Sequence, residues 1–465
     1  MIPVRPRGRG RSPSAVALLV ALGVGALALA SCGGEGDPGS DGGAAEAPKV
    51  RRPNVLVISL DTLRADRLGS YGYHRDTSPF LDELAARGIR FENAIVNTHG
   101  TPPSHTTLLT GLYQSTHRVS WVPAGPEGRN DRVPEGLTLM QEVFQREGYA
   151  TIGVTDNGYV AANFGFDQGF DVFRDRHIGA EAGTNLTLDL VRQRLGGDKP
   201  LFVFYHTYEP HTPYEPPAEY RAMFEPPPSD VVPTGEALLP FQDDASSFSA
   251  DDIQHLSDLY DAGIRYTDDV MRRFFDELEG LGFFENHLTV VTSDHGEEFG
   301  DHGGLLHRVS LYDELLRVPL LISGTEIPAG VVDNRAASLV DVAPTVYTAL
   351  RMRPRAPISG RDLLGPLEDH PRWAFAQYAG LLEAARGDKW KLIRDQMNGE
   401  VELYNLHKDP GETRNVAARN PEMVERLERR INHWRRSCPE LDLERRDAQL
   451  TDEDVQKLRA LGYVQ

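Results

Sequence analysis

The sequence predicts an α/β fold with a large, mostly parallel sheet covered by helices on both faces, and a smaller C-terminal antiparallel sheet with a helix. From residue 54 onward, short apolar runs alternate with helical patterns, as expected for strands buried on both faces of a parallel sheet. From about residue 372 the pattern changes to short strands in series, followed by one charged helix. The length of 465 residues favours one large domain with a smaller companion.

The elements of the large domain are expected in a regular order. The run "NVLVISL" at residues 54–60 has the composition of a buried strand. A helix should follow, with Ser78 as its N-cap, Pro79 in its first turn and Gly88 as its terminator. Further strands are predicted at residues 149–156, 200–208, 287–294 and 317–324, and further helices at 251–280 and 341–350.

The C-terminal part is expected to form the smaller sheet. Short strands are predicted at residues 372–380, 389–395 and 401–406, and the charged helix at 421–436. Residues 222–252 form a long polar insertion, and a loop of this length is usually functional or disordered.

The N-terminal segment resembles a bacterial lipoprotein signal. A basic stretch precedes an apolar run at residues 15–30 that is short for a membrane span, and Leu29-Ala30-Ser31-Cys32 resembles a lipobox. Cys32 would then be the lipidated first residue of the mature protein. The alternative is an ordinary cleaved signal with a cysteine there by chance. We expect a lipid anchor in the cell envelope, at the periplasmic face of the outer membrane.

These observations divide the chain into four segments. They are a lipoprotein signal peptide (1–31), a flexible tether (32–52), a catalytic domain (53–365) and a C-terminal α+β subdomain (366–465). The net charge of −20 argues against nucleic acid as a partner. It also means that an anionic substrate would need a local positive site, such as a metal.

Acids and histidines follow the predicted strands. Asp61 follows the first strand, Asp294 and His295 follow a late one, and His206 and His211 lie at the end of the strand near residue 205. Ligands of open α/β sheets bind at the carboxyl ends of the strands, and carboxylates with imidazole suit a divalent cation. Each aspartate alone could instead cap a turn or a loop.

The segment "NTHGTPPSHTTLLTG", residues 97–111, is expected to begin a short helix near Thr101. Pro102 and Pro103 fit a first helical turn, where a missing N–H costs little. The Thr101 hydroxyl could simply cap the helix. Alternatively, the helix N-terminus and a metal meet an anion here, and Thr101 attacks its phosphorus or sulfur atom.

Several motifs resemble those of the sulfatases, within the alkaline phosphatase superfamily. They include "NVLVISLDTLRADRLGSYGY", "TPPSHTTLLTGLYQSTH", "YHTYEPHTPYEPP", "TVVTSDHGEEFGDHGGLLHRVSLYDELLRVPLLI" and "VELYNLHKDPGETRNVA". The resemblance extends over about residues 53–465 and follows the expected order. It implies an alkaline-phosphatase-like fold and cleavage of a sulfate or phosphate ester.

The resemblance also implies roles for individual residues. The metal ligands would be Asp61, Thr101, Asp294 and His295. The catalytic residues would be Thr101 as nucleophile, with His211 and His307 near the ester oxygens or the leaving group. The substrate-binding residues would be His105, His117 and His206. Thr62 replaces a second aspartate of the family pattern, so a four-acid calcium site is in doubt.

The nucleophile motif departs from the family pattern. Typical sulfatases have Cys or Ser that is oxidised to formylglycine, within Cys-x-Pro-x-Arg. Here Thr101 stands at the nucleophile position and His105 at the arginine position, so no formylglycine is expected. Threonine nucleophiles are typical of the phosphotransferring branch of the superfamily.

The sequence therefore predicts a lipid-anchored hydrolase of a sulfate or phosphate ester, with a phosphodiester also possible. It would use one or two divalent ions (Ca, Mn, Mg or Zn), with Thr101 as nucleophile. One alternative is a transferase that passes a phospho group from Thr101 to an acceptor hydroxyl. A second alternative is a non-catalytic binder of sulfated or phosphorylated glycans. The expected partner is an anionic ester, such as a sulfated or phosphorylated glycan or lipid.

Overall fold

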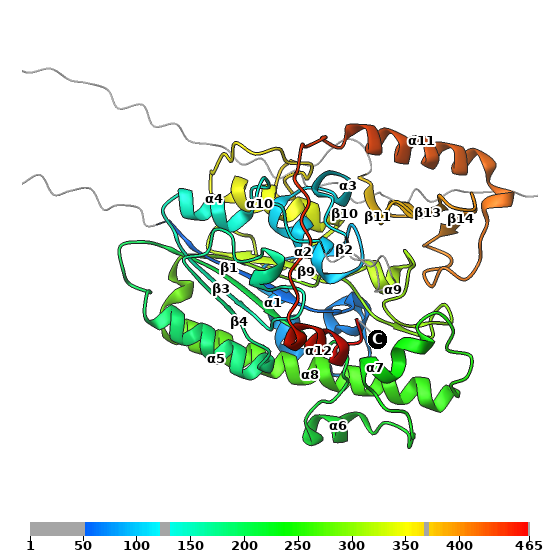
Figure 1. Cartoon of the computed structure of the whole chain (residues 1–465), viewed down its shortest axis with the longest axis horizontal. Helices are drawn as coiled ribbons and strands as arrows, with labels where there is room; N and C mark the ends of the chain where they lie inside the picture. Colours follow the sequence, from blue (N-terminus) through cyan, green and yellow to red (C-terminus); the bar gives the residue numbers. More distant parts are fainter. Residues whose placement is uncertain (1–51, 121–130, 367–371, 464–465) are drawn as a thin grey trace, which may run out of the picture. The chain divides into compact units, whose positions relative to one another are not determined.

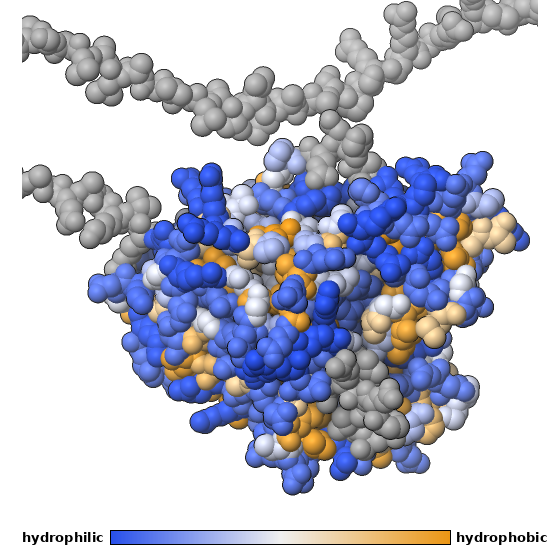
Figure 2. All heavy atoms as spheres, turned by 45° about the horizontal axis from the view of Figure 1, so that its top comes forward, coloured by the Kyte–Doolittle hydropathy of each residue, from blue (hydrophilic) through white to orange (hydrophobic). Residues whose placement is uncertain are grey.

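The computed structural model describes residues 52–120, 131–366 and 372–463. The predicted signal peptide, Cys32 and nearly all of the tether lie outside these residues. Within them, an eight-stranded mixed sheet and a four-stranded antiparallel sheet are both flanked by helices (Figure 1). The predicted fold class is confirmed. Figure 2 shows that hydrophilic residues dominate the displayed face of the protein.

The large sheet has the strand order β10-β2-β9-β6-β1-β5-β3-β4. Its strands are β1 (Asn54–Leu60), β2 (Ile89–Ile95), β3 (Ala150–Thr155), β4 (Val172–Asp175), β5 (Leu201–Thr207), β6 (His287–Thr292), β9 (Leu320–Gly324) and β10 (Val331–Ser338). β1 lies in the middle and pairs in parallel with β5 and β6. β9 runs antiparallel to β2 and β6. The other pairs are parallel, so the prediction of a mostly parallel sheet is correct.

Helices cover both faces of this sheet. Successive residues of each strand point to opposite sides, so each strand contributes side chains to two separate cores. Val55 and Val57 of β1 pack in one core, and Leu56 and Ile58 in another. The first core includes residues of α2 (Thr101–Thr110), α4 (Met140–Arg146) and α10 (Val342–Ala349). The second includes residues of α1 (Pro79–Ala86), α5 (Gly179–Arg192) and α8 (Ala250–Gly280).

The small sheet contains β11 (Ala374–Tyr378), β12 (Leu382–Arg386), β13 (Trp390–Asp395) and β14 (Val401–Asn405), all antiparallel. Leu427, Ile431 and Trp434 of α11 (Pro421–Ser437) form a third core with residues of this sheet. Figure 1 shows α11 lying along it. The domain boundary near residue 365 stays a prediction.

The remaining elements are short. They are α3 (Gln114–His117), α6 (Ala218–Phe224), α7 (Gly235–Leu238), β7 (Glu298–Phe299), β8 (Leu305–Leu306), α9 (Asp313–Leu316) and α12 (Asp452–Ala460). Most of the predicted polar insertion connects α6 to α8 and contains α7. Within the described chain, no helix is both long and apolar enough to span a membrane.

Candidate active site

Asp61, Asp294 and His295 meet at one edge of the large sheet. Asp61 directly follows β1, and Asp294 lies two residues after the neighbouring parallel strand β6. The His295 Nε2 atom lies 3.4 Å from Asp294 Oδ2 and 3.9 Å from Asp61 Oδ1. All three side chains are fully buried. In the structure these three residues lie together, as their positions at the ends of two predicted strands indicated.

The charges of this group are not balanced by Lys or Arg. Asp61 Oδ1 and Asp294 Oδ2 are buried and accept no hydrogen bond within the described chain. Burial, and then the nearby Asp294 carboxylate, raise the pKa of Asp61 well above its usual value. Burial works against ionisation of Asp294 too, but His295, His105 and His206 lower its pKa. Two unpaired carboxylate oxygens beside an imidazole form a donor set that fits a divalent cation.

Thr101 is the first residue of α2, and its side chain does not cap the helix. The N-cap position is Gly100, which has a φ of 115° that favours glycine. Thr101 Oγ1 instead lies 2.9 Å from the Tyr463 hydroxyl and 3.5 Å from His295 Nε2. The capping interpretation of Thr101 is therefore wrong. Because prolines occupy positions 102 and 103, Thr101 carries the only backbone N–H among the first three helical residues.

His105 and His206 lie next to the two aspartates, Asp61 and Asp294. His206 Nε2 is 3.1 Å from Asp61 Oδ2, and His105 Nδ1 is 3.6 Å from Asp294 Oδ2. His105 also lies 2.8 Å from the Thr101 carbonyl oxygen and 3.0 Å from Ser59 Oγ. Both imidazoles are buried, and burial lowers their pKa values to about 4. They are thus placed to orient the two aspartates and the start of α2.

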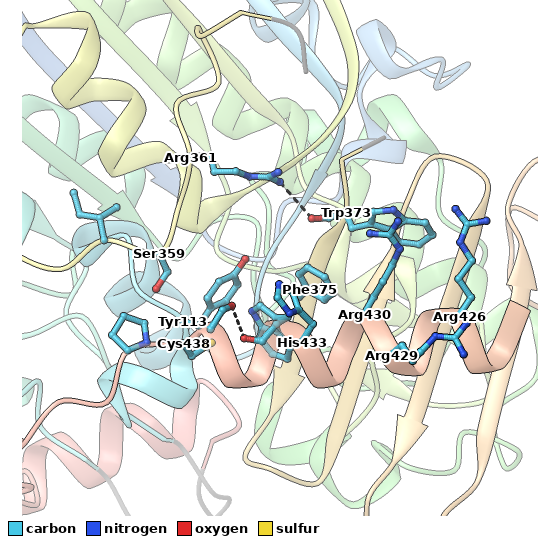
Figure 3. Close-up of a pocket in the computed structure, with 14 residues that line it drawn as sticks. Tyr113, Ser359, Arg361, Trp373, Phe375, Arg426, Arg429, Arg430, His433 and Cys438 are labelled. Carbon is cyan, nitrogen blue, oxygen red and sulfur yellow. Dashed lines mark hydrogen bonds between the residues drawn. The ribbon is translucent and has the colours of Figure 1, made fainter. Parts of the chain in front are cut away.

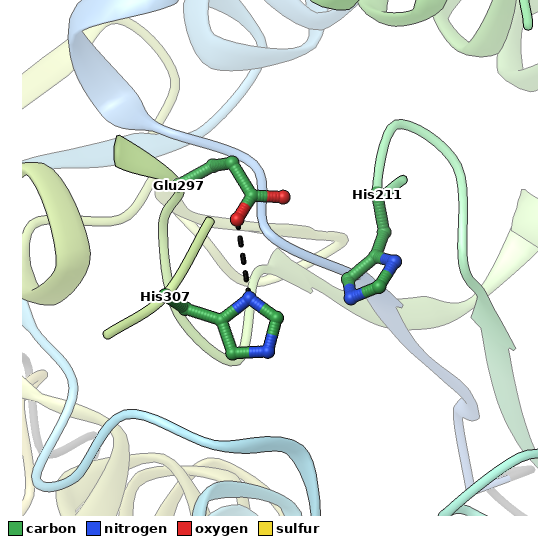
Figure 4. Close-up of side chains that lie close together, drawn as sticks. All are labelled: His211, Glu297 and His307. Carbon is green, nitrogen blue, oxygen red and sulfur yellow. Dashed lines mark hydrogen bonds and ion pairs between the residues drawn. The ribbon is translucent and has the colours of Figure 1, made fainter. Parts of the chain in front are cut away.

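A second group of side chains lies beside the first. His211, Glu297 and His307 bring one ligand atom each within 4.8 Å of one another. Figure 4 shows the Glu297 carboxylate facing the His307 ring, and the His307 Nδ1 to Glu297 Oε1 distance is 3.1 Å. Glu297 Oε2 and His211 Nε2 are buried without a hydrogen-bond partner in the described residues. The ring centroids of His307 and His295 are 4.8 Å apart, so the two groups are adjacent.

Both imidazoles of the second group favour the neutral form. Burial lowers the pKa of His211 to about 3, although Glu297 acts in the opposite direction. Burial, and then His295, lower the pKa of His307 well below its usual value. Neutral imidazole is the form that binds a metal, whereas a proton donor must first become charged.

Two residues of the site were missed from the sequence. Glu297 lies in the "SDHGEEFG" loop, five residues after β6, where no strand-end argument applies. Tyr463 follows α12, and its ring centroid lies 5.3 Å from His211 and 5.5 Å from His307. The preceding Gly462 packs against Gly235 of α7, where an added Cβ on Gly235 would lie 2.4 Å from Gly462 Cα. This close approach holds Tyr463 over Thr101.

His117 is not brought to these groups. Its Nε2 lies 3.1 Å from Thr107 Oγ1, and its Nδ1 accepts a hydrogen bond from the Val119 N–H. Thr62 remains close to the site, where its N–H donates to Asp294 Oδ1. The nearby acid Asp301 forms an ion pair with Arg64 at 2.9 Å, which leaves it outside the group around Asp61.

The sequence profile of the sulfatase family matches residues 53–352. This chain belongs to the sulfatase family. Members of that family hydrolyse sulfate esters, and the matched region contains every residue of the two groups, whereas Tyr463 lies outside it. The family match does not show which residue is the nucleophile, so the role of Thr101 is a separate question.

A curated relative is similar in sequence, and two solved structures are similar in fold. Arylsulfatase K of Bos taurus is 25% identical, and the alignment covers 85% of this chain and 84% of the relative. The phosphonate monoester hydrolase of Agrobacterium radiobacter has a similar fold, with a TM-score of 0.69 and 21% identity over 86% of this chain and 99% of that one. The protein BT4656, solved with D-glucosamine-2-N,6-O-disulfate, has a TM-score of 0.70 and 19% identity over 84% and 99%.

Proposed function

We propose that this protein is a metal-dependent hydrolase of sulfate or phosphate esters in which unmodified Thr101 is the nucleophile. The observation that carries the proposal is the position of the Thr101 hydroxyl. It lies 3.5 Å from His295 Nε2, beside two buried aspartates whose facing oxygens have no hydrogen-bond partner in the described chain. A helix cap would not require such a location.

Asp61, Asp294 and His295 would hold the cation, with Thr101 contacting it. When bound, a divalent ion lowers the pKa of the hydroxyl and shields the negative charge of the ester. The Thr101 hydroxyl would release its proton to solvent, its Oγ1 atom would form a bond to the phosphorus or sulfur atom, and the bond to the alcohol oxygen would break. Water hydrolyses the ester on Thr101 in a second step and restores the hydroxyl.

The leaving oxygen requires a proton or a second positive charge. In a one-ion enzyme, His211 or His307 supplies the proton, and the anionic substrate raises the pKa of whichever ring it contacts. In a two-ion enzyme, His211, Glu297 and His307 hold the second cation. Metal analysis of the purified protein decides between these forms, because the first predicts one ion per chain and the second predicts two.

The nucleophile is tested with Thr101→Ala on a panel of aryl sulfate, phosphate monoester, phosphodiester and phosphonate substrates. The rate on the best substrate should fall by about four powers of ten, since a whole chemical step is lost. The matched control is Thr110→Ala, a buried threonine at the other end of α2. Unchanged turnover by Thr101→Ala would identify the attacking group as water.

The same panel distinguishes the alternative functions. A transferase would release little product until an acceptor alcohol is added, and it would leave a modified Thr101 detectable by intact mass. A non-catalytic glycan binder would turn over none of the substrates, even with metal bound. Trapping with a slow ester should add the transferred group to Thr101 and not to Ser104.

We also propose that Cys32 carries a lipid and holds the protein at the periplasmic face of the outer membrane. The support is the Leu29-Ala30-Ser31-Cys32 sequence after a short apolar run. One acyl chain binds a membrane only marginally, so a stable anchor requires several chains. Mass spectrometry of the mature N-terminus should find a lipid-modified Cys32. A mature chain that begins at another residue would contradict this proposal.

A further inference from the structure

A cavity of about 730 Å³ lies away from the candidate active site. It is bounded by α11, by β11 with the preceding Trp373, and by the loop around Ser359 and Arg361. Figure 3 shows Arg426, Arg429 and Arg430 projecting from α11 toward this cavity. The volume is in the range that binds small ligands or a few sugar units.

The lining of this cavity is positive, although the chain as a whole is strongly acidic. Among the described residues, four arginines and one histidine line it and no acidic residue does, and the two decisive arginines are Arg426 and Arg430. The net charge of the chain is −20. Arg429 has a partner in Glu425, but Arg426 and Arg430 form no ion pair within the described residues. Such an unbalanced concentration of positive charge attracts an anion.

Aromatic side chains support these arginines. The Arg430 guanidinium lies over the Trp373 ring, 5.0 Å from its centroid, which fixes its direction. Phe375 and Trp434 stack with centroids 5.1 Å apart. Arg430 Nε and the Trp373 indole N–H are buried without a hydrogen-bond partner in the described chain. Both are donors, and an anion with several oxygen atoms would satisfy them.

We propose that this cavity, formed by Trp373, Arg426, Arg430 and their neighbours, is a binding site for an anionic oligosaccharide. Guanidinium groups pair with sulfate, phosphate or carboxylate groups through parallel hydrogen bonds. The aromatic side chains offer the flat apolar surfaces on which sugar rings pack. The combination of a concave shape with both surface types favours a charged sugar over a free inorganic ion.

The site is separate from the reacting residues. Tyr113 lines the cavity and lies just after α2, whereas Thr101 begins that helix. A ten-residue helix is about 15 Å long, so the cavity and Thr101 are separated by roughly that distance. Binding here would hold a long anionic chain on the enzyme without taking part in bond cleavage. This inference does not depend on which ester the enzyme cleaves.

Binding is measured with a size-defined dextran sulfate oligosaccharide, with neutral dextran of equal length as reference. The test variant is Arg426→Gln/Arg430→Gln. The control is Arg419→Gln/Arg436→Gln, which removes the same charge from two exposed arginines that do not line the cavity. A third variant, Ser437→Tyr, keeps the charge but places a large side chain on the cavity wall.

We expect the test variant to bind dextran sulfate about tenfold more weakly or worse, since it loses charge-assisted hydrogen bonds. Ser437→Tyr should also weaken binding, whereas the control and the wild type should agree within about twofold. All variants should turn over a small aryl ester at the wild-type rate, so failure of this site is distinct from failure of the proposed function.

Three results would overturn the proposal. Equal losses in the test and control variants would show that the whole surface charge, and not the cavity, attracts the polymer. Full binding by Ser437→Tyr together with the test variant would place the oligosaccharide elsewhere. Binding of phosphatidylglycerol vesicles without binding of dextran sulfate would identify the face as a membrane contact.

Discussion

Two of the buried groups of acidic side chains in the described residues differ in how their charges are paired. At the end of β1 and β6, Asp61 and Asp294 face each other with only imidazoles nearby. Near the small sheet, Asp313 and Glu412 instead share Lys391, whose Nζ lies 2.8 Å from each carboxylate. Arg386 adds a further contact to Asp313 at 2.8 Å.

This difference distinguishes a group of acids that stabilises the fold from a group that forms a candidate functional site. Lys391 and Arg386 outweigh burial and lower the pKa of Asp313 below its usual value. The pKa of the second acid of each group is raised instead: burial and Asp294 raise the pKa of Asp61, and burial raises the pKa of Glu412 to about 7, so the two groups differ in their Lys and Arg partners and not in their pKa values. A fold can neutralise buried acids internally, as it does beside β13, where the pairing ties α9 to the small sheet. Acids left without Lys or Arg are consistent with the proposed metal site at the ends of β1 and β6.

The same substitution, Asp to Asn, should have different effects on turnover in the two groups. Asp294→Asn should lower turnover by about four powers of ten, because the cation loses a charged ligand. The metal-free variant should be less stable than the metal-free wild type, because the lowered pKa of Asp294 means that its ionised form stabilises the fold. Turnover assays and denaturant unfolding of the apo proteins check both statements. A fully active variant would mean that the metal site has been misplaced.

Asp313→Asn should also cost stability but should spare turnover. Lys391 and Arg386 would lose a buried partner, which should lower the free energy of unfolding by about 3–5 kcal/mol. Urea unfolding measures the loss. Reduced turnover at a temperature where the variant is folded would show that this group also supports the active site.

In a one-ion enzyme, removal of metal should affect the group around Asp61 and Asp294 and leave the group around Lys391 unchanged. A ligand present at a hundred times its Kd stabilises a folded protein by about 2.7 kcal/mol, so chelation should lower the Tm of the wild type. The Tm of Asp313→Asn should fall by the same amount on chelation, whereas that of Asp294→Asn should hardly change. Thermal scans with and without EDTA provide the comparison.

Acid should remove the stabilisation that Asp313 provides beside Lys391 and Arg386. The folded-state pKa of Asp313 is depressed, so its contribution is present above the unfolded value of about 3.9 and is lost as pH falls below it. The stability gap between wild type and Asp313→Asn should therefore shrink by on the order of 2 kcal/mol between pH 5 and pH 2. A gap that is constant over this range would contradict the assigned ion pairs.

The smallest effect is expected at Tyr463. Tyr463→Phe removes one hydroxyl contact to Thr101 and leaves both acid groups intact. A typical hydrogen bond contributes about 1 kcal/mol, so turnover should change by about fivefold, with metal content unchanged. Kinetics and metal analysis of this variant show whether the phenol positions the nucleophile. Metal loss in Tyr463→Phe would assign the residue to the cation site instead.

Much of this arrangement could be predicted from the sequence, for identifiable reasons. Apolar runs that end on acids revealed β1 and β6, and parallel pairing then brings Asp61 to Asp294. The direction of β9 could not be predicted, because an apolar run carries no orientation. β12 was missed because "LEAAR" mixes charged and small residues without a clear alternation. Ser78 and Pro79 correctly marked the start of α1.

Residues of the candidate site were harder to predict where tertiary contacts determine their position. His105 looked like a pocket residue, whereas it lies fully buried against the Thr101 carbonyl and Ser59. Glu297 and Tyr463 belong to the site through a loop and a distant segment, and no periodic pattern marks either. The roles proposed for His211, His307 and His117 stay predictions.

The contact between Gly235 and Gly462 has a practical consequence for engineering. It seats Tyr463 beside Thr101, the proposed nucleophile, so chain trimming or fusion near residue 463 should change the surroundings of Thr101. A shortened protein ending before α12 would lack the Tyr463 hydroxyl that contacts Thr101. Purification tags and reporter fusions are therefore better placed in the tether that precedes β1.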